Sequence, residues 1–327
     1  MGARPRLTLA LLVRDEESRI EAAIESASRF ADEIVVRDTG SRDRTPEKAV
    51  QLGARVLRGA WHDDFAEARN ALVGAANGDW VLMLDADETV RDGLGDLPRL
   101  MAQTDAVAYA VEIESAIGFG RQQRSWSPRL FRRKKALRYC YRAHEVLLNA
   151  TPALPCPLAV AHTGFMPSRR YQKALRNLAL VEADLRDRGG DPYLLWHRGR
   201  ELELLGRKAD ADASYEAMAK LLRQMDADVL SGLEFAPEAV SDWAESLADR
   251  GEARFTVGLA SRVVLAHPNR PLARFVHARA LAAAGRERDA ALAARQILER
   301  RTWRFGFPAE NDVIETHAPA LLEALGV

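Results

Sequence analysis

Three carboxylates follow directly on an apolar segment at residues 80–88, which read Trp-Val-Leu-Met-Leu-Asp-Ala-Asp-Glu. Carboxylates crowded at a strand end repel one another and lose hydration unless a positive group lies close by. Asp85 and Asp87 are two positions apart and therefore point to the same side of an extended chain. Grouped oxygen ligands of this kind suit Mg²⁺ or Mn²⁺, which also takes water and phosphate oxygens. The segment predicts a metal site that grips a diphosphate; the alternative is a solvated turn, because Asp is common in turns.

The first half of the chain alternates between strand and helix patterns. Apolar runs of strand length predict buried strands at 7–13, 33–36, 54–57 and 80–84, and apolar residues at helical spacing predict helices at 16–30, 45–52 and 65–76. This alternation predicts right-handed crossovers and a parallel sheet, in which the loops after the strands share one edge. Open α/β sheets bind ligands at that edge. We therefore expect three pairs to converge there: Asp15/Glu16, Asp38/Thr39 and Asp85/Asp87.

Carboxylates at such an edge suit a nucleotide. A carboxylate accepts hydrogen bonds from ribose hydroxyls or from a base N–H, and a metal offsets the pyrophosphate charge. Neither Gly-x-Gly-x-x-Gly nor Gly-x-x-x-x-Gly-Lys-Ser/Thr is present, which argues against a dinucleotide fold and against the usual nucleoside-triphosphate loop. Asp38 has a second interpretation as a turn former. Arg69 and Asn70 have one as exposed residues of their helix.

Length and composition limit the classes of protein. A chain of 327 residues can form two domains. Its 47 basic and 47 acidic residues argue against a nucleic-acid coat and a polybasic membrane anchor. Cys140 and Cys156 are too few for a disulfide framework, which indicates unpaired thiols in a reducing compartment. The apolar run 7–13 is too short to cross a bilayer and has no small-residue cleavage site, so we expect a cytoplasmic protein.

Several segments, in this order and spacing, resemble the inverting family 2 glycosyltransferases with the nucleotide-sugar-binding GT-A fold. The closer likeness is to the branch with lipopolysaccharide core glucosyltransferases and bacteriocin S-glycosyltransferases. It covers residues 7–180 and implies a GT-A domain at 1–168, a mostly parallel α/β sheet. The matching segments are Arg14-Asp15-Glu16-Glu17, residues 32–41, Trp61 with Asp64-Phe65, Ala68-Arg69-Asn70, Leu84-Asp85-Ala86-Asp87-Glu88, residues 127–132, Tyr139 with Ala143-His144-Glu145, and residues 162–165.

The resemblance implies roles for the matching residues. Asp87 is the better candidate for direct metal contact, and Asp85 for contact with ribose or metal-bound water. His162 would be a third metal ligand or a donor to the diphosphate; a structural histidine is the alternative. Arg129 would offset phosphate charge through its donor fork, with a surface ion pair as the alternative. The implied nucleotide contacts are Glu16, Asp38, Arg69, Asn70 and Asp85.

The acceptor must lose a proton, because a protonated hydroxyl is a poor nucleophile. Glu145 is the candidate base that the resemblance implies, with His144 as the alternative. Two residues depart from the family pattern, which usually has Asn at the position of Asp15 and an apolar residue at that of Arg37. The departure at Asp15 puts the identity of the base or sugar in doubt, because it adds negative charge near a diphosphate.

After Ser168 the pattern changes to long helices rich in Ala, Leu, Arg and Glu, which predicts an all-α domain at 169–327. Three degenerate tetratricopeptide-like helix pairs fit, with an insertion around 225–235. Stacked pairs of this kind make concave surfaces that hold partners; a helical buttress or a dimer interface is the alternative. The aromatic segment 303–308 would dock back or join an interface. The positions that fit are Leu195, Gly199, Leu202, Ala211, Tyr215, Ala244, Leu247, Pro268, Ala278, Leu281 and Ala290.

Together these features predict a metal-dependent inverting glycosyltransferase that uses a nucleotide-sugar, most simply a UDP-sugar, with Mn²⁺ or Mg²⁺. The acceptor is left open among a glycan, a lipid and a peptide, and no nucleic-acid partner is expected. Association with a membrane surface and homodimerisation stay open. The alternative is a non-catalytic helical-repeat scaffold with a vestigial nucleotide site. A nucleotidyltransferase is disfavoured because the glycine- and lysine-bearing loop it needs is missing after the first strand.

Overall fold

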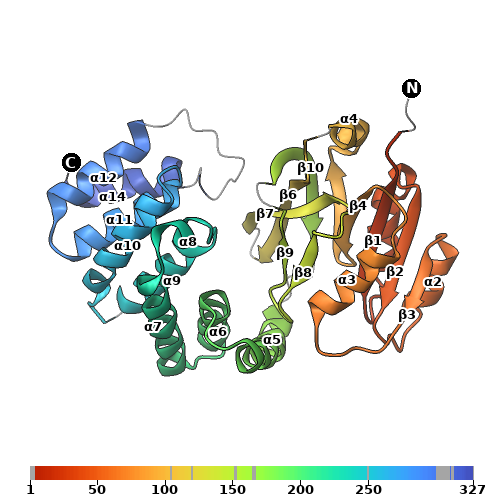
Figure 1. The fold of residues 1–327 in the computed structure, drawn as a ribbon, viewed down its shortest axis with the longest axis horizontal. Coiled ribbons are helices and arrows are strands. Elements are labelled where there is room, and N and C mark those ends of the chain that lie inside the picture. Colours follow the sequence, from red (N-terminus) through yellow and green to blue (C-terminus); the bar gives the residue numbers. More distant parts are fainter. Residues whose placement is uncertain are drawn as a thin grey trace. The chain divides into compact units, whose positions relative to one another are not determined.

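The computed structural model describes residues 4–103, 105–118, 121–150, 153–163, 167–248, 250–299, 310 and 313–326. The chain divides into two units, Met1–Arg170 and Tyr171–Val327 (Figure 1). The expected fold class, a GT-A type α/β domain followed by a tetratricopeptide-like all-α domain, is confirmed. The boundary after residue 168 stays a prediction. The segment 303–308, expected to dock or to join an interface, lies outside the described residues.

The first four strands form a parallel sheet in the order β3-β2-β1-β4, as the alternating pattern predicts. Helix α1 buries Ile20, Ala23, Ile24 and Ala27, which lie on one face of the helix. Gly78, just before β4, lets the chain pass close to Thr8 of β1, since a Cβ at Gly78 would lie 2.7 Å from the Thr8 backbone nitrogen. The elements are β1 (Leu7–Val13), α1 (Ile20–Ala27), β2 (Glu33–Asp38), α2 (Thr45–Gln51), β3 (Arg55–Arg58), α3 (Phe65–Ala75) and β4 (Trp80–Asp85).

Helix α1 begins four residues later than the sequence pattern predicts. The backbone N–H of Glu16 donates to Thr45 Oγ1 over 2.8 Å, and that of Glu17 donates to Asp43 Oδ2 over 3.0 Å. These bonds tie the loop after β1 to the loop after β2. The residues that could have formed the first helical turn therefore belong to the edge of the sheet.

The second half of the sheet adds antiparallel pairs and one parallel pair, β6–β10, so the whole sheet is mixed. The full order is β3-β2-β1-β4-β7-β6-β10-β5, and the pairs β4–β7, β6–β7 and β10–β5 are antiparallel. A separate two-stranded sheet pairs β8 with β9. The remaining elements of this unit are β5 (Glu88–Asp92), α4 (Leu97–Ala102), β6 (Ala108–Gly118), β7 (Arg121–Arg132), β8 (Arg138–Cys140), β9 (Val146–Leu148) and β10 (Leu154–His162).

The carboxyl ends of the central strands lie level with one another. Val13 pairs with Asp38, and Leu12 pairs with Asp85 across the other side of β1. The predicted convergence of the three acidic loops at one edge is therefore confirmed.

Apolar side chains cover both faces of this sheet. One core contains Leu82 and Val111 together with residues of α1 and α4, and the other contains Met83 and Phe131 together with residues of α3, β8 and β9. Side chains alternate along a strand, so Asp85 lies on the same face of the sheet as Met83, which precedes it by two residues. We call this the α3 face of the sheet.

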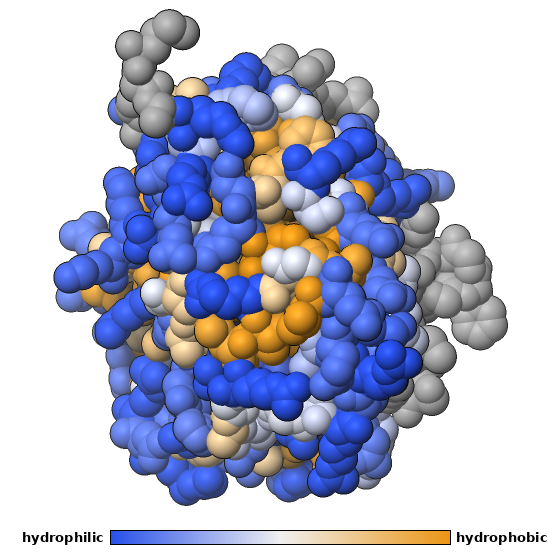
Figure 2. All heavy atoms as spheres, turned by 90° about the vertical axis from the view of Figure 1, so that its right-hand side faces the viewer, coloured by the Kyte–Doolittle hydropathy of each residue, from blue (hydrophilic) through white to orange (hydrophobic). Residues whose placement is uncertain are grey.

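Strand β3 is one outer edge of the sheet, and its ends are charged. Arg55 and Arg58 are exposed at these ends, which hinders pairing with another chain. Figure 2 shows the side of the molecule on which α2 and β3 lie in Figure 1. Apolar side chains gather in the middle of that view, and hydrophilic residues surround them.

The second unit is built from antiparallel helix pairs. The predicted pairs correspond to α6 with α7, α9 with α10, and α11 with α12, and the predicted insertion forms the short helix α8. Gly199 of α6 packs against Tyr215 of α7 so closely that a Cβ would lie 2.4 Å from Tyr215 Cε1. The helices are α5 (Pro167–Arg188), α6 (Pro192–Leu204), α7 (Lys208–Gln224), α8 (Ala227–Ser231), α9 (Ala236–Ala248), α10 (Val257–Ala266), α11 (Pro271–Ala283), α12 (Glu287–Glu299) and α14 (Ala318–Ala324).

Cys140 and Cys156 are unpaired, as expected. Among the described residues, no helix combines the length and the apolar character needed to cross a membrane.

Candidate functional site

Asp85, the last residue of β4, lies between two arginines. Arg69 Nη2 lies 2.7 Å from Asp85 Oδ1, and Arg129 Nη2 lies 3.0 Å from Oδ2. Arg69 comes from α3, and Arg129 comes from the antiparallel strand β7. Burial by itself would raise the pKa of Asp85, but the two guanidinium groups outweigh it and hold that pKa below its usual range. Asp85 is therefore ionised at neutral pH.

Arg69 also binds the candidate base. Its Nε lies 2.6 Å from Glu145 Oε1. Arg69 is only 6% exposed, so the alternative of an exposed helix residue is wrong for it. Burial by itself would lower the pKa of Arg69, but the charges of Asp85 and Glu145 raise it well above the usual value. One buried guanidinium thus joins a carboxylate at the end of β4 to a carboxylate just before β9.

Asn70, the neighbour of Arg69, supports the strand β8. Its Nδ2 donates to the Tyr139 carbonyl over 2.9 Å, and the Tyr139 backbone N–H donates to Asn70 Oδ1 over 2.7 Å. The Arg69 Cζ atom lies 5.6 Å from the centroid of the Tyr139 ring, within cation–π range. Burial raises the pKa of Tyr139 to about 12. The structure therefore gives Asn70 a supporting contact, and its contact with a nucleotide stays a prediction.

Glu88 belongs to this cluster, although no role is predicted for it from the sequence. It is 2% exposed; its Oε1 accepts from Arg129 Nη2 over 2.7 Å, and its Oε2 accepts from the Asp85 backbone N–H over 2.9 Å. Burial raises the pKa of Glu88, and Arg129 offsets only part of this rise. The signal in the sequence is that Glu88 begins strand β5 directly after Asp-x-Asp. Arg129 therefore takes part in a buried network rather than a surface ion pair.

Asp87 pairs with the predicted third ligand. His162 Nε2 lies 3.3 Å from Asp87 Oδ2, and His162 Nδ1 lies 3.1 Å from Ser115 Oγ. The Asp87 carbonyl accepts from the Thr163 backbone N–H over 3.0 Å, which fixes this turn against the end of β10. Ser115 is a partner that the sequence did not reveal, because its contact depends on the register of β6 and β10.

The pair fits a divalent cation that keeps other ligands. If Nδ1–H donates to Ser115, the lone pair of His162 Nε2 is on the side of Asp87, as in many metal sites. Among the described residues, no set of three or more His, Cys, Asp and Glu side chains could hold a metal by itself. Two protein ligands leave room for water and phosphate oxygens, the arrangement usual for Mg²⁺. A metal contact for Asp85 stays a prediction, because both its oxygens accept from arginines.

The loops after β1 and β2 place two further predicted residues. Asp38 is buried, and its carboxylate accepts from the backbone N–H groups of Gly40 and Ser41 and from the Ser41 hydroxyl. Asp38 therefore stabilises a turn, which confirms its second interpretation as a turn former. Glu16 Oε2 accepts from Arg19 Nη1 over 3.0 Å. Nucleotide contacts of Asp38 and Glu16 stay predictions.

Asp15 and His144 are two further residues singled out from the sequence. Asp15 Oδ1 accepts from the Arg42 backbone N–H over 2.7 Å, a role that the family's usual Asn could also fill. His144, the alternative base, has a φ of 55° and is half-buried beside Glu145.

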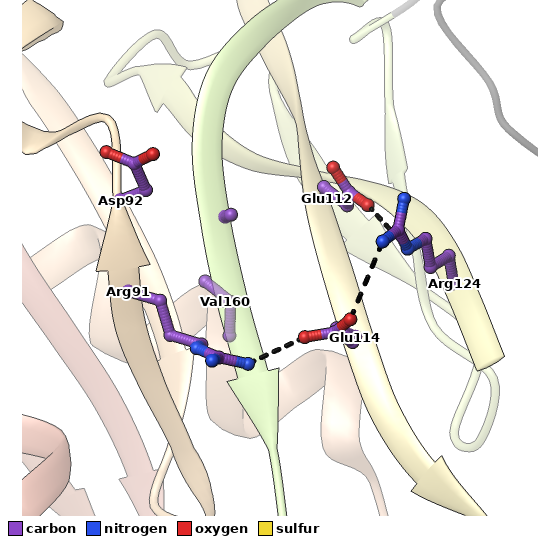
Figure 3. A pocket seen from close by; sticks show the side chains of 7 residues that line it. Arg91, Asp92, Glu112, Glu114, Arg124 and Val160 are labelled. Atoms are coloured by element: carbon purple, nitrogen blue, oxygen red, sulfur yellow. Dashed lines mark hydrogen bonds and ion pairs between the residues drawn. The ribbon is translucent and has the colours of Figure 1, made fainter. Parts of the chain in front are cut away.

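A separate hollow lies on the outer strands β5, β6, β7 and β10 (Figure 3). Its volume is about 360 Å³. Its charges pair with one another: Arg91 Nη1 lies 2.7 Å from Glu114 Oε2, and Arg124 Nε lies 3.3 Å from Glu112 Oε1. None of the residues predicted from the sequence lines this hollow.

Three arginines of the first unit keep buried nitrogen atoms without a hydrogen-bond acceptor among the described residues. These atoms are Arg37 Nε, Arg69 Nη1 and Arg129 Nε. Buried donors are rarely left unpaired in folded proteins. The arrangement is therefore suited to a ligand rich in acceptor oxygens.

Residues 9–152 match the family model described as glycosyl transferase family 2. The first unit contains a glycosyltransferase family 2 domain. The match includes Arg69, Asp85 and Glu145, whereas His162 lies beyond its end.

Two similar proteins align with more of the chain than this domain. A TPR repeat-containing protein of Synechococcus elongatus is 33% identical over 238 residues, 68% of this chain and 58% of that protein. The SPbeta prophage-derived glycosyltransferase SunS of Bacillus subtilis is 27% identical over 217 residues, 63% of this chain and 51% of that protein. The chain thus spans between half and two thirds of the length of these relatives.

Among solved structures, glucosyl-3-phosphoglycerate synthase from Mycobacterium tuberculosis, in complex with Mn²⁺ and UDP-glucose, is similar to part of the chain. The likeness has a TM-score of 0.28 and 26% identity, and covers 36% of this chain and 45% of that one.

Proposed function

We propose that this chain transfers a sugar from a nucleoside diphosphate sugar to an acceptor, with inversion at the anomeric carbon and with the help of a divalent cation. The observation that carries the proposal is the shared contact of Arg69 with Asp85 and Glu145. It brings a carboxylate from the strand end that binds ligands in this fold class close to a carboxylate that can act as a base. If the ion pairs only stabilised the fold, Asp85 and Glu145 would not need to share the same buried arginine.

The donor in this proposal is a UDP-sugar, as the resemblance to inverting family 2 enzymes implies. Asp85, with Asp38 and Glu16 in the neighbouring loops, would accept from the ribose or the base. Asp87 and His162 would hold Mn²⁺ or Mg²⁺ against the diphosphate. The bound metal would offset the negative charge that develops on the leaving diphosphate. Arg69 Nη1 and Arg129 Nε, the buried donors without acceptors among the described residues, would find ligand oxygens.

Glu145 is the proposed general base. As the acceptor oxygen attacks the anomeric carbon, Glu145 takes its proton, the bond between the sugar and the diphosphate breaks, and the nucleoside diphosphate leaves with the electron pair. Glu145 Oε1 is held by Arg69, which fixes the direction of the carboxylate. The acceptor would be a glycan, a lipid or a peptide, and the helical unit is the proposed place for acceptor binding or for a homodimer contact.

A comparison of two variants tests this function. Release of UDP from UDP-sugars, with Mn²⁺ and a panel of glycan, lipid and peptide acceptors, is measured for the wild type, Glu145→Gln and Glu47→Gln. Glu47 is an exposed carboxylate that pairs with Arg58, and its variant should keep full activity. Glu145→Gln should still be stabilised by the donor but lose transfer by about 100-fold or more. Transfer at the normal rate in Glu145→Gln would place the base elsewhere, and a wild type that binds no activated sugar would favour a scaffold.

A further inference from the structure

Arg37 lies in one row with Asp85 across the α3 face of the sheet. Leu12 of β1 pairs with Arg37 on one side and with Asp85 on the other. Directly paired residues point to the same face of a sheet. Neighbouring strands are about 4.8 Å apart, so the backbones of Arg37 and Asp85 are separated by roughly 10 Å. Side chains that reach inward from the two positions could contact the ribose and the base of one nucleoside.

The guanidinium of Arg37 has no partner in the described part of the chain. Its Nε–H is buried and donates to no carboxylate or carbonyl of the described residues. The other arginines of this face differ, because Arg69 and Arg129 each bind two carboxylates. A surface arginine without function would ordinarily extend into water instead of keeping a buried nitrogen unpaired.

Gly59 gives this guanidinium its space. A Cβ at Gly59 would lie 2.8 Å from Arg37 Nη2 and 3.0 Å from Nη1. The Gly59 backbone N–H donates to the Asp38 carbonyl over 3.1 Å, so this glycine is tied to the end of β2. The guanidinium is therefore seated against the start of the segment after β3, at the edge that carries Asp38 and Asp85.

We propose that Arg37 selects the base of the nucleotide donor by donating hydrogen bonds to a carbonyl on the edge of the base. The inference rests on the proposed function and deepens it. Arg37 can only donate hydrogen bonds, so its partner on the ligand must be an acceptor. A base with a carbonyl on that edge, such as uracil, thymine or guanine, supplies one. Cytosine and adenine present an amino group there, which a guanidinium cannot bind.

The test compares two ligands that differ in this one feature of the base. UDP and CDP, each with Mn²⁺, are titrated calorimetrically into the wild type, Arg37→Met, Arg37→Lys and Arg58→Met. Arg58 lies on the neighbouring strand and pairs with Glu47. Arg58→Met therefore removes the same charge as Arg37→Met and serves as its control. Thermal unfolding of each variant checks that it is folded. Because Arg37 has no partner among the described residues, its replacement breaks no contact there.

The wild type should bind UDP at least tenfold more tightly than CDP. Arg37→Met should weaken the binding of UDP about 10- to 100-fold and should change the binding of CDP little, so that the preference for UDP disappears. Arg37→Lys should not restore the preference, because lysine lacks the planar donor fork, and Arg58→Met should behave as the wild type. Equal losses for UDP and CDP, with rescue by lysine, would mean that Arg37 only meets the diphosphate and would overturn the proposal.

An unchanged preference in Arg37→Met would overturn it as well, while leaving the proposed function in place. A wild type that binds neither nucleotide, nor GDP or dTDP, would remove the proposed function and this inference with it.

Discussion

Arg69 Nε and Glu145 Oε1 lie 2.6 Å apart, although 76 positions separate the two residues in the chain. Helix α3 supplies the arginine, and the segment between β8 and β9 supplies the carboxylate. The Asn70 contacts with Tyr139 hold these two parts together beside the pair. The same arginine reaches Asp85, so the position of the proposed base is tied to the end of β4.

Replacement of Arg69 should be costly because it leaves two carboxylates without their buried cation. We expect Arg69→Met to lower the free energy of unfolding by about 3 kcal/mol, measured by urea denaturation at pH 7. Arg99→Met is the control, since Arg99 forms an exposed pair with Asp96 and should cost at most about 1 kcal/mol. Equal effects of the two variants would contradict the buried network described for Arg69.

Loss of Asp87 should remove the response to metal. In the wild type, Mn²⁺ with UDP at 100 times the dissociation constant should raise the free energy of unfolding by about 2.7 kcal/mol, and EDTA should abolish this gain. Asp87→Ala and His162→Ala should each show little or no gain in a thermal-shift assay. Asp92→Ala removes an exposed aspartate and should retain the gain. A full response in Asp87→Ala would exclude the metal role of this residue.

Glu33 should make stability depend on pH in the acid range. Burial by itself would raise its pKa, but hydrogen bonds from Arg55, the Asn77 backbone and Thr8 outweigh it and lower the pKa from 4.5 to about 2. Because the folded-state pKa lies below the unfolded one, the stabilisation is complete above the unfolded value and is lost as the pH falls towards 2. Glu33→Gln should therefore cost roughly 2 kcal/mol at pH 7 and almost nothing near pH 2 in urea titrations. A cost that stays constant over this range would show that the charge of Glu33 is unimportant.

The packing of α6 against α7 has a matched pair of tests. Gly199→Ala places a methyl group against the Tyr215 ring and should cost about 1–3 kcal/mol of unfolding free energy. Gly258→Ala in α10 meets no atom within 4 Å and should be neutral or stabilise by up to about 1 kcal/mol. The two variants are compared by thermal unfolding of the full chain. Tolerance of alanine at Gly199 would mean that these helices can move apart readily.

The parallel half of the fold follows from local sequence patterns. Residues 7–13 and 80–84 are unbroken apolar runs, and Asp38 and Asp85 come directly at strand ends, so their convergence follows from topology. The strands β6, β7 and β10 could not be placed in the same way, because the pairs β4–β7, β10–β5 and β6–β10 join residues far apart in the chain and depend on register. Arg129 and Ser115 therefore acquire partners that no local pattern indicates.

The chemistry of the site was predictable by residue type but not by contact. Asp87 and His162 meet, as a metal site requires, but Asp85 is engaged by two arginines that a sequence pattern places on separate elements. The sequence predicts that Arg69 lies at the nucleotide or at the helix surface. Only the structure shows that it is buried between two carboxylates. Glu88 had a signal in the run of carboxylates, which gave no indication of its contact with Arg129.

The central claim is that the end of β4 binds a divalent cation and a nucleoside diphosphate. The most direct measurement is a crystal structure of the full chain with UDP and Mn²⁺, with the manganese located by its anomalous scattering. We predict one manganese peak within coordination distance of Asp87 Oδ2 and His162 Nε2, with the diphosphate of UDP bound to it. A manganese ion and nucleotide bound elsewhere, or crystals grown with excess UDP and Mn²⁺ that contain neither, would contradict the claim.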